Sequence, residues 1–200
     1  GSRSNHETTT DVDGGDGHES GTEADRFADT GGLIGAVVGG TISQSFSAST
    51  VTAGGEYTAT GGFVGAAGSA VTFLDCYSTS SVLGGDGEDG LGGFIGLNSA
   101  RISSSYSTGS VAQTQGAGGF LGIGEAETGD LDHTYWDLDT SGINDPHRGA
   151  GNIADDPGIT GLTDAQLKSG LPAGFDPNIW GQNPNINNGY PYLLANPPQQ

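Results

Sequence analysis

Residues Gly92 to Val111 read GGFIGLNSARISSSYSTGSV, and this pattern occurs four times in the chain. Each copy begins with a glycine pair and a short apolar run: GGLIG at Gly31, GGFVG at Gly61, GGFIG at Gly92 and GGFLG at Gly118. An aromatic residue follows in each copy, at Phe46, Tyr77, Tyr106 and Tyr135. The copies recur about every 30 residues, and a fixed period of this size is the signature of a solenoid.

Apolar and polar residues alternate within each repeat, as they do in a strand with one buried face. In the third repeat Ile102 and Tyr106 share parity, so we expect the aromatic residue to face the interior together with the apolar residue before it. Ile95 with Leu97 indicates another strand, and Val111 marks a third. The glycines between these runs suit the sharp corners of a coil.

These features predict an all-β protein, a right-handed parallel β-solenoid (β-helix) of about four coils whose equivalent residues stack about 4.8 Å apart. We divide the chain into a disordered, acidic N-terminal tail at residues 1–26, solenoid repeats at 27–142 and a C-terminal capping segment at 143–200. Thr163 and Gln166 have the spacing of a capping box, which predicts one short helix from Asp164 to about Ser169.

The charge of the chain is strongly one-sided, with 24 Asp and Glu against 5 Lys and Arg and a formal net charge of −19. Such a chain repels nucleic acid and anionic lipid, so neither is expected as a partner. No apolar run approaches the roughly 18–20 residues that a membrane helix needs, so no membrane insertion by this fragment is expected. The acidic, lysine-poor composition also favours a halophilic origin, which circular dichroism measured against salt concentration would test.

Cys76 is the only cysteine, which excludes an intrachain disulfide and a zinc site built from several cysteines. It lies directly before the aromatic residue of the second repeat. We expect it to pack as a small apolar side chain between coils.

The repeats resemble a known family in their motifs. GGFVG, GGFIG and GGFLG, followed by Cys76-Tyr-Ser-Thr and by Ser105-Tyr-Ser-Thr-Gly-Ser-Val, are similar to the GLUG repeat. The resemblance covers residues 31 to about 142 and implies an extracellular repeat module of large exported, adhesin-like surface proteins. It brings no catalytic residues with it.

The C-terminal part resembles the segment that closes such arrays, in its YWDLDTSG motif at Tyr135 and its GLTDAQLK motif at Gly161. An uncapped solenoid end is a sheet edge prone to association. We therefore expect the apolar residues of this segment to cover the open end of the last coil. These residues are Trp180, Tyr190, Tyr192 and Leu193.

Two acidic clusters are candidates for calcium, which prefers oxygen ligands. One is the insertion between the second and third repeats, with Asp86, Glu88 and Asp89. The other lies at the last repeat, with Asp130 and Asp132. A solvated acidic loop is the alternative for both, and no other cofactor is expected.

The most enzyme-like cluster also lies at the last repeat. Parallel β-helices include polysaccharide lyases and glycosidases, which use paired carboxylates, but this is an analogy of fold alone. The chain has no nucleophile elbow, no His-Glu-x-x-His helix and no phosphate loop. We therefore predict no catalytic residues and no enzyme. The residues of the cluster are Asp130, Asp132, His133, Asp137 and Asp139.

Two classes of function remain. The first is a non-catalytic structural or adhesive module of a secreted or cell-surface protein, whose partners are a surface glycan, a protein or neighbouring subunits joined end to end. The alternative is a β-helix that binds or cleaves carbohydrate through surface carboxylates and aromatic side chains. The position of Tyr77, Tyr106 and Tyr135 distinguishes them, because a sugar-binding platform needs exposed rings.

Overall fold

A computed structural model describes residues 12–13, 29–54, 58–84, 90–125 and 130–198. These residues form mainly short strands, with one α-helix and one 3₁₀ helix. The elements are β1 Val12–Asp13, β2 Asp29–Gly31, β3 Ile34–Ser47, β4 Thr50–Thr52, β5 Ala59–Gly61, β6 Val64–Ser78, β7 Ser81–Leu83, β8 Gly90–Gly92, β9 Ile95–Asn98, β10 Arg101–Ser107, β11 Ala117–Gly118, β12 Leu121–Gly124, β13 Leu131–Asp137, β14 Ile159–Leu162, α1 Asp164–Leu167, β15 Trp180–Gly181, η2 Asn187–Gly189 and β16 Tyr192–Leu193.

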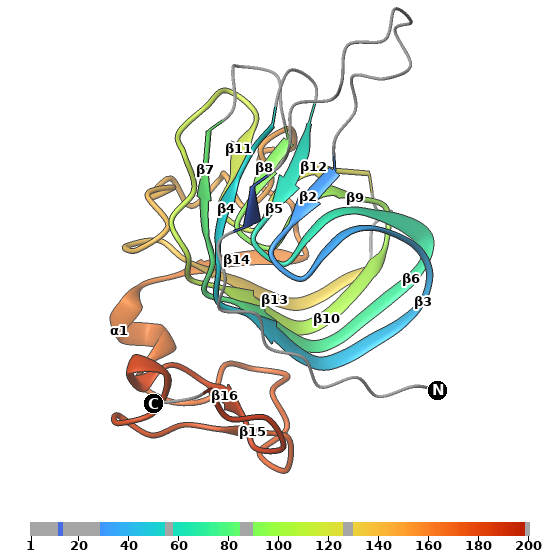
Figure 1. Ribbon diagram of the computed structural model, residues 1–200. Helices are drawn as coiled ribbons and strands as arrows, with labels where there is room; N and C mark the ends of the chain where they lie inside the picture. The colour runs from blue at the N-terminus through green and yellow to red at the C-terminus, as the bar shows by residue number, and fades with distance from the viewer. Residues whose placement is uncertain (1–11, 14–28, 55–57, 85–89, 126–129, 199–200) are drawn as a thin grey trace, which may run out of the picture.

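The strands confirm the predicted parallel β-solenoid, which makes about three turns (Figure 1). Three sheets form its sides: β1, β4 and β7; β11, β8, β5 and β2; and a larger sheet that contains β3, β6, β9, β10, β12, β13 and β14. Equivalent residues of successive repeats pair in register, as in the row that joins Phe46, Tyr77, Tyr106 and Tyr135. The long strands β3 and β6 each bend round a corner of the coil. In the third and fourth repeats the chain is divided at this corner into two strands, β9 and β10 or β12 and β13.

The interior of the solenoid is held by rows of identical side chains. Phe63, Phe94 and Phe120 come from the glycine-apolar blocks, and their rings stack with centroids 4.8 Å apart at both steps. All three rings are fully buried. Burial of one such side chain is worth about 1.5–3 kcal/mol relative to leaving it exposed. A second row joins the valines of the third strand, Val51, Val82 and Val111, as predicted.

The prediction that the repeat aromatics face the interior is wrong. Ile102 belongs to the inner core, whereas Tyr106 lies in a separate cluster outside the coil. Between them Ser104 adopts a left-handed conformation with φ 49°, which reverses the alternation of side chains along the strand. The same break occurs in each repeat, at Gln44, Asp75, Ser104 and His133.

Each break turns a small polar side chain into the core in place of the aromatic ring. In the third repeat Ser105 Oγ donates to the Ser103 carbonyl at 2.9 Å and accepts from the Cys76 amide at 3.1 Å. Cys76 is fully buried and directs its thiol towards the Leu74 carbonyl, 3.5 Å away. Burial raises the pKa of this thiol to about 12. Cys76 is therefore a structural residue that stays protonated.

Cys76→Ser should change the free energy of unfolding by less than about 1 kcal/mol, because a serine hydroxyl supplies the same hydrogen bond. Ser45 already occupies the paired position in the first repeat and donates to the Ser43 carbonyl. Urea denaturation measures the change, and Cys76→Val, which has no donor, should be less stable than Cys76→Ser. In the wild-type protein the thiol should react with Ellman's reagent only after denaturation; rapid reaction in the native protein would contradict this assignment.

The N-terminal tail was predicted at residues 1–26, and most of it lies outside the described residues. The described part is β1, in which Val12 pairs with Val51 of β4. This strand was not predicted, because a single valine among acidic and glycine residues has no periodicity.

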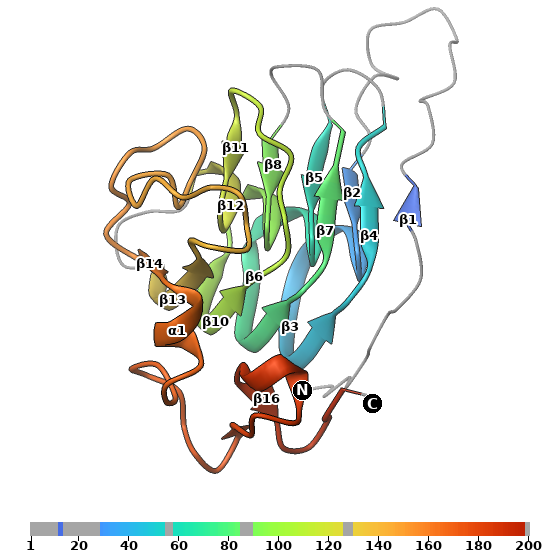
Figure 2. The ribbon, with the colours of Figure 1, turned by 90° about the vertical axis from the view of Figure 1, so that its left-hand side faces the viewer.

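The prediction that the apolar residues of the C-terminal segment cover the end of the last coil is wrong. Figures 1 and 2 show α1, β15 and β16 beside the strands β3, β6, β10 and β13, on the outside of the coil. The last coil is instead followed by β14, which pairs with β13, and by Ala150, which bridges to Leu121. The repeat pattern therefore continues for part of one further coil.

The helix α1 confirms the capping-box prediction. Thr163 is its N-cap, its hydroxyl accepts from the Gln166 amide, and the Gln166 side chain accepts from the Thr163 amide at 2.8 Å. The helix ends at Leu167, somewhat earlier than expected. None of the helices in the described part of the chain is long and apolar enough to cross a membrane.

Candidate functional site

The outer face of the large sheet carries the aromatic residues of the four repeats. Phe46, Tyr77, Tyr106 and Tyr135 form a row on this face, here called the aromatic ladder. Phe46 and Tyr77 stack with centroids 4.7 Å apart, and Tyr77 and Tyr106 stack at 5.1 Å, with planes nearly parallel at both steps. Aromatic pairs in such arrangements are worth about 0.5–1.5 kcal/mol beyond their buried area.

The C-terminal segment covers the aromatic ladder. The Trp180 ring lies across the two central rungs, 5.9 Å from both Tyr77 and Tyr106, and Phe175 packs against Trp180 at 4.5 Å. The first three rungs are fully buried and Tyr135 is 8% exposed. We call the ladder together with these covering residues the cap-docking face. Its rings do not present a platform to solvent.

Polar contacts fix the position of the C-terminal segment, here called the cap, on the aromatic ladder. The Tyr106 hydroxyl donates to the Pro191 carbonyl at 2.5 Å and accepts from Asn187 Nδ2 at 2.9 Å. The Tyr135 hydroxyl donates to the Ala173 carbonyl at 3.0 Å. Burial is the main cause that raises the pKa of both phenols. Both stay protonated and serve as hydrogen-bond donors.

The left-handed residues at the breaks also contact the cap. Ser104 Oγ donates to the Gly174 carbonyl at 2.9 Å. Asp75 is 4% exposed, and its carboxylate accepts from Trp180 Nε1 at 2.9 Å. Burial raises the pKa of Asp75, a smaller effect of Asp176 adds to the rise, and the Trp180 hydrogen bond opposes it. Asp75 therefore anchors the cap, although burial disfavours its charged form.

Asp75→Asn should raise the melting temperature at pH 7, because an amide keeps an oxygen for Trp180 and removes the burial penalty on the charge. Asn also tolerates a positive φ. The pKa of Asp75 is higher in the folded protein than the unfolded value of 3.8. Its contribution to the stability of the fold is therefore most favourable below pH 3.8 and is lost as the pH rises through the folded pKa. The difference in melting temperature between Asp75→Asn and the wild type should thus shrink as the pH falls towards about 4.

Thermal unfolding of wild type, Asp75→Asn and Asp75→Ala at several pH values tests this. Asp75→Ala lacks the acceptor for Trp180 and should melt below the wild type at pH 7. An Asp75→Asn variant that melts lower than the wild type at pH 7 would show that the negative charge itself holds the cap.

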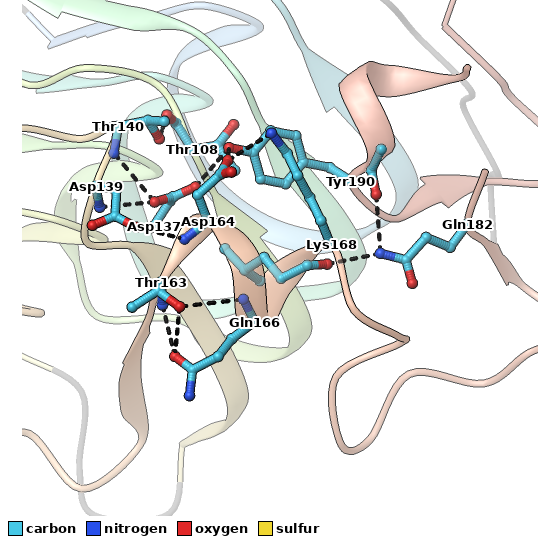
Figure 3. A network of polar contacts seen from close by, with 12 residues as sticks. Thr108, Asp137, Asp139, Thr140, Thr163, Asp164, Gln166, Lys168, Gln182 and Tyr190 are labelled. Carbon is cyan, nitrogen blue, oxygen red and sulfur yellow. Dashed lines mark hydrogen bonds and ion pairs between the residues drawn. The ribbon is translucent and has the colours of Figure 1, made fainter. Parts of the chain in front are cut away.

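A second polar network joins the cap to the fourth repeat (Figure 3). Asp137 is fully buried, and its Oδ1 accepts from the amides of Asp139 at 2.8 Å and Thr140 at 3.2 Å. Its Oδ2 accepts from the Tyr190 hydroxyl at 2.6 Å, and that hydroxyl also contacts Asp164. Burial and both carboxylates raise the pKa of Tyr190 well above its usual range. The phenol is thus held protonated between two carboxyl groups.

Lys168 completes this network from the C-terminal end of α1. Its ammonium lies 2.7 Å from Asp164 Oδ1 and 4.4 Å from the centre of the Tyr190 ring. The Lys168 hydrogen bond is the main cause that lowers the pKa of Asp164, and the Tyr190 hydrogen bond adds to it. Asp164 also donates its amide to Asp139 Oδ2 at 2.9 Å. These charges hold α1 against the solenoid and leave Asp137 no access to solvent.

The structure divides the acidic cluster predicted at the last repeat. Asp137 and Asp139 belong to the network with α1, whereas Asp130 pairs with Arg101 at 2.8 Å and Asp132 with His133 at 2.8 Å. Asp86, Glu88 and Asp89 lie outside the described residues. Within the described ranges, no group of three or more His, Cys, Asp or Glu side chains could hold a metal ion. The calcium sites therefore stay predictions.

Sequence reasoning missed the cap-docking face. Asp75 and Trp180 are 105 residues apart, and nothing in the local pattern of either residue indicates the contact. One signal was present: the residue two positions before each aromatic is Gln, Asp, Ser or His rather than a β-branched residue. Asp and His are enriched at positive φ, so this column was a hint of a break in the strand.

Comparison with known proteins adds no family to this description. No family model matches the chain, and neither a curated protein nor a solved structure matches it. The fold and the contacts above therefore carry the functional argument, and the resemblance to the GLUG repeat stays a prediction from the motifs.

Proposed function

We propose that this protein is a non-catalytic structural or adhesive module of a secreted or cell-surface protein, built from GLUG-like repeats. One observation carries the proposal: the aromatic ladder and the buried carboxylates Asp75 and Asp137 have their partners inside the fold. Side chains used in this way stiffen the solenoid and fix its cap. They are not available to bind and turn over a substrate.

The carbohydrate-active alternative loses its strongest feature. Rings that bind sugars must present a face to the ligand, but Trp180 and Phe175 lie over the aromatic ladder. The acid–base pair of a glycosidase must reach the scissile bond, but Asp137 is fully buried. The proposed partners are a surface glycan or a protein, bound on the outside of the solenoid without chemical change.

A glycan array and a reducing-sugar assay on the full chain test the proposal together. Binding to a glycan or protein without release of reducing ends supports an adhesive module, and the absence of both supports a structural one. Release of reducing ends from a polysaccharide would overturn the proposal if Asp130→Asn or Asp132→Asn abolished it without unfolding the protein. Melting in the presence of a chelator tests calcium separately, because loss of a bound ion lowers the melting temperature.

A further inference from the structure

At each end of the solenoid a large-sheet strand has a described neighbour on one side alone, β3 in the first coil and β14 beyond the last. Among the residues that the structure describes, β3 pairs with β6 and with no strand on its other edge. Its inward side chains are accordingly only partly covered. Ile34, Val37 and Ile42 are half-buried, whereas their paired residues Val64, Ala67 and Phe73 in the second repeat are 0–4% exposed.

The exposed stretch of β3 lies in its N-terminal half. Residues 36–41 are mostly exposed, and Val38 at their centre is 85% exposed, the most exposed of the large apolar side chains. β1 extends a different sheet, because it pairs with β4, which follows the C-terminal end of β3. β1 therefore does not pair with the edge near Val38, and neither does any other strand that the structure describes. An open edge of this kind offers rows of amide and carbonyl groups to a further strand.

The sequence of this edge lacks the charged and proline residues that usually protect an edge against association, although a register shift between Val37 and Gly39 makes the strand irregular there. Soluble proteins place charged residues, especially lysine, or proline on exposed edge strands. The stretch from Thr30 to Gly55 has no charged residue, no histidine and no proline, in a chain of net charge −19. The opposite end of the solenoid is acidic, with exposed Asp155 and half-buried Asp156 just before β14. At the first coil, two copies of the chain can thus approach without bringing Asp155 and Asp156 of one copy against the other.

We propose that two copies of this chain associate through the outer edges of β3, antiparallel, about a two-fold axis near Val38. A two-fold axis normal to the sheet reverses the strand direction, so identical edges meet in an antiparallel ladder. The contact continues the large sheet from one copy into the other and covers the half-buried row of the first coil. It goes beyond the proposed function, because a homodimer forms in this way whether the module is adhesive or structural.

This arrangement replaces the end-to-end chain of subunits that the sequence suggested. Head-to-tail stacking would bring the uncharged edge of one copy against the acidic end of the next, and so remove water from Asp155, which contacts His147, and from Asp156. A head-to-head pair keeps both acidic ends far apart and exposed to solvent. It also closes the assembly at two copies, because the acidic residues before β14 leave β3 as the uncharged end strand of each copy.

Disulfide trapping tests the register. Residues directly opposite in an antiparallel pair have Cα atoms about 4.5–5.5 Å apart, within the range that a disulfide spans. Val38→Cys in a Cys76→Ser background should therefore form a covalent dimer on mild oxidation with oxidised glutathione. Leu83→Cys in the same background is the control, since Leu83 is 44% exposed but lies on β7, and it should form no covalent dimer.

Sedimentation of the full chain tests the association without cross-linking. The wild type should be a dimer at about 100 μM, which saturates an interface of micromolar affinity. Val38→Glu should be a monomer with unchanged circular dichroism, because it places two carboxylates at the axis, and Leu83→Glu should remain a dimer. A monomeric wild type, a Val38→Glu dimer, absence of the Val38→Cys cross-link or growth beyond two copies would each overturn the proposal.

Discussion

Tyr106→Ala is expected to lower the free energy of unfolding by about 3–5 kcal/mol, the usual result of truncating a buried aromatic side chain. Tyr106 stacks on Tyr77, contacts Trp180 and donates to the Pro191 carbonyl. Its loss opens a cavity in the middle of the aromatic ladder and removes the central rung under the cap. In a chain of 200 residues each kcal/mol corresponds to about 2–4 °C in melting temperature.

Differential scanning calorimetry measures the shift, and limited proteolysis tests whether the cap detaches first. In Tyr106→Ala, cleavage should begin within residues 163–198 while the repeats are still protected. Tyr106→Phe is the matched control: it keeps the ring and loses only the hydroxyl, so it should lose about 1–3 kcal/mol. Equal loss in the two variants would mean that the hydrogen bond, and not the stacking, holds the cap.

Gly92→Ala is expected to destabilise the protein strongly, because Gly92 is one of the corner glycines at which a Cβ would meet backbone atoms. A Cβ at Gly92 would lie 2.0 Å from the Ile95 carbonyl oxygen and 2.6 Å from the Gly122 amide nitrogen. Both contacts are with backbone, one within the same corner and one in the next coil, so neither can rotate away. Overpacking of a core usually destabilises by about 1–3 kcal/mol, and here we expect at least the upper value.

Urea denaturation and the yield of soluble protein measure this effect. Gly170→Ala is the control, because a Cβ at Gly170 would meet no atom within 4 Å. It should leave the stability within about 0.5 kcal/mol of the wild type, as surface substitutions usually do. If Gly92→Ala were as stable as Gly170→Ala, the close approach of adjacent coils at the glycine corners would not be required for the fold.

The repeat period explains why the fold could be predicted from the sequence. Phe63, Phe94 and Phe120 occupy the same place in successive copies, and a side chain that stacks on its equivalent needs only a correct period to be placed. The valine row and the capping box at Thr163 are equally local signals. Each depends on residues within one repeat or one turn, so the sequence alone determines them.

The candidate site could not be predicted in the same way. We inferred from their even spacing that Ile102 and Tyr106 face the same side, which holds only for an unbroken strand. The left-handed Ser104 between them places the Tyr106 ring on the outer face. No glycine marks this break, and the polar residue at this position of each repeat was its one local sign. The expectation that the tail covers the end of the coil was wrong for a related reason. The tail packs instead on the aromatic ladder at the side of the solenoid.

The sequence by itself determined the stacked coil, its glycine corners and its acidic character, because these follow from period and composition. Only the tertiary structure decided what the aromatic residues do, which carboxylates are buried and which edge remains open. Those properties depend on contacts such as Asp75 with Trp180, which join residues 105 positions apart. A contact over that distance exists only after the coils have stacked and the C-terminal segment has folded back along them.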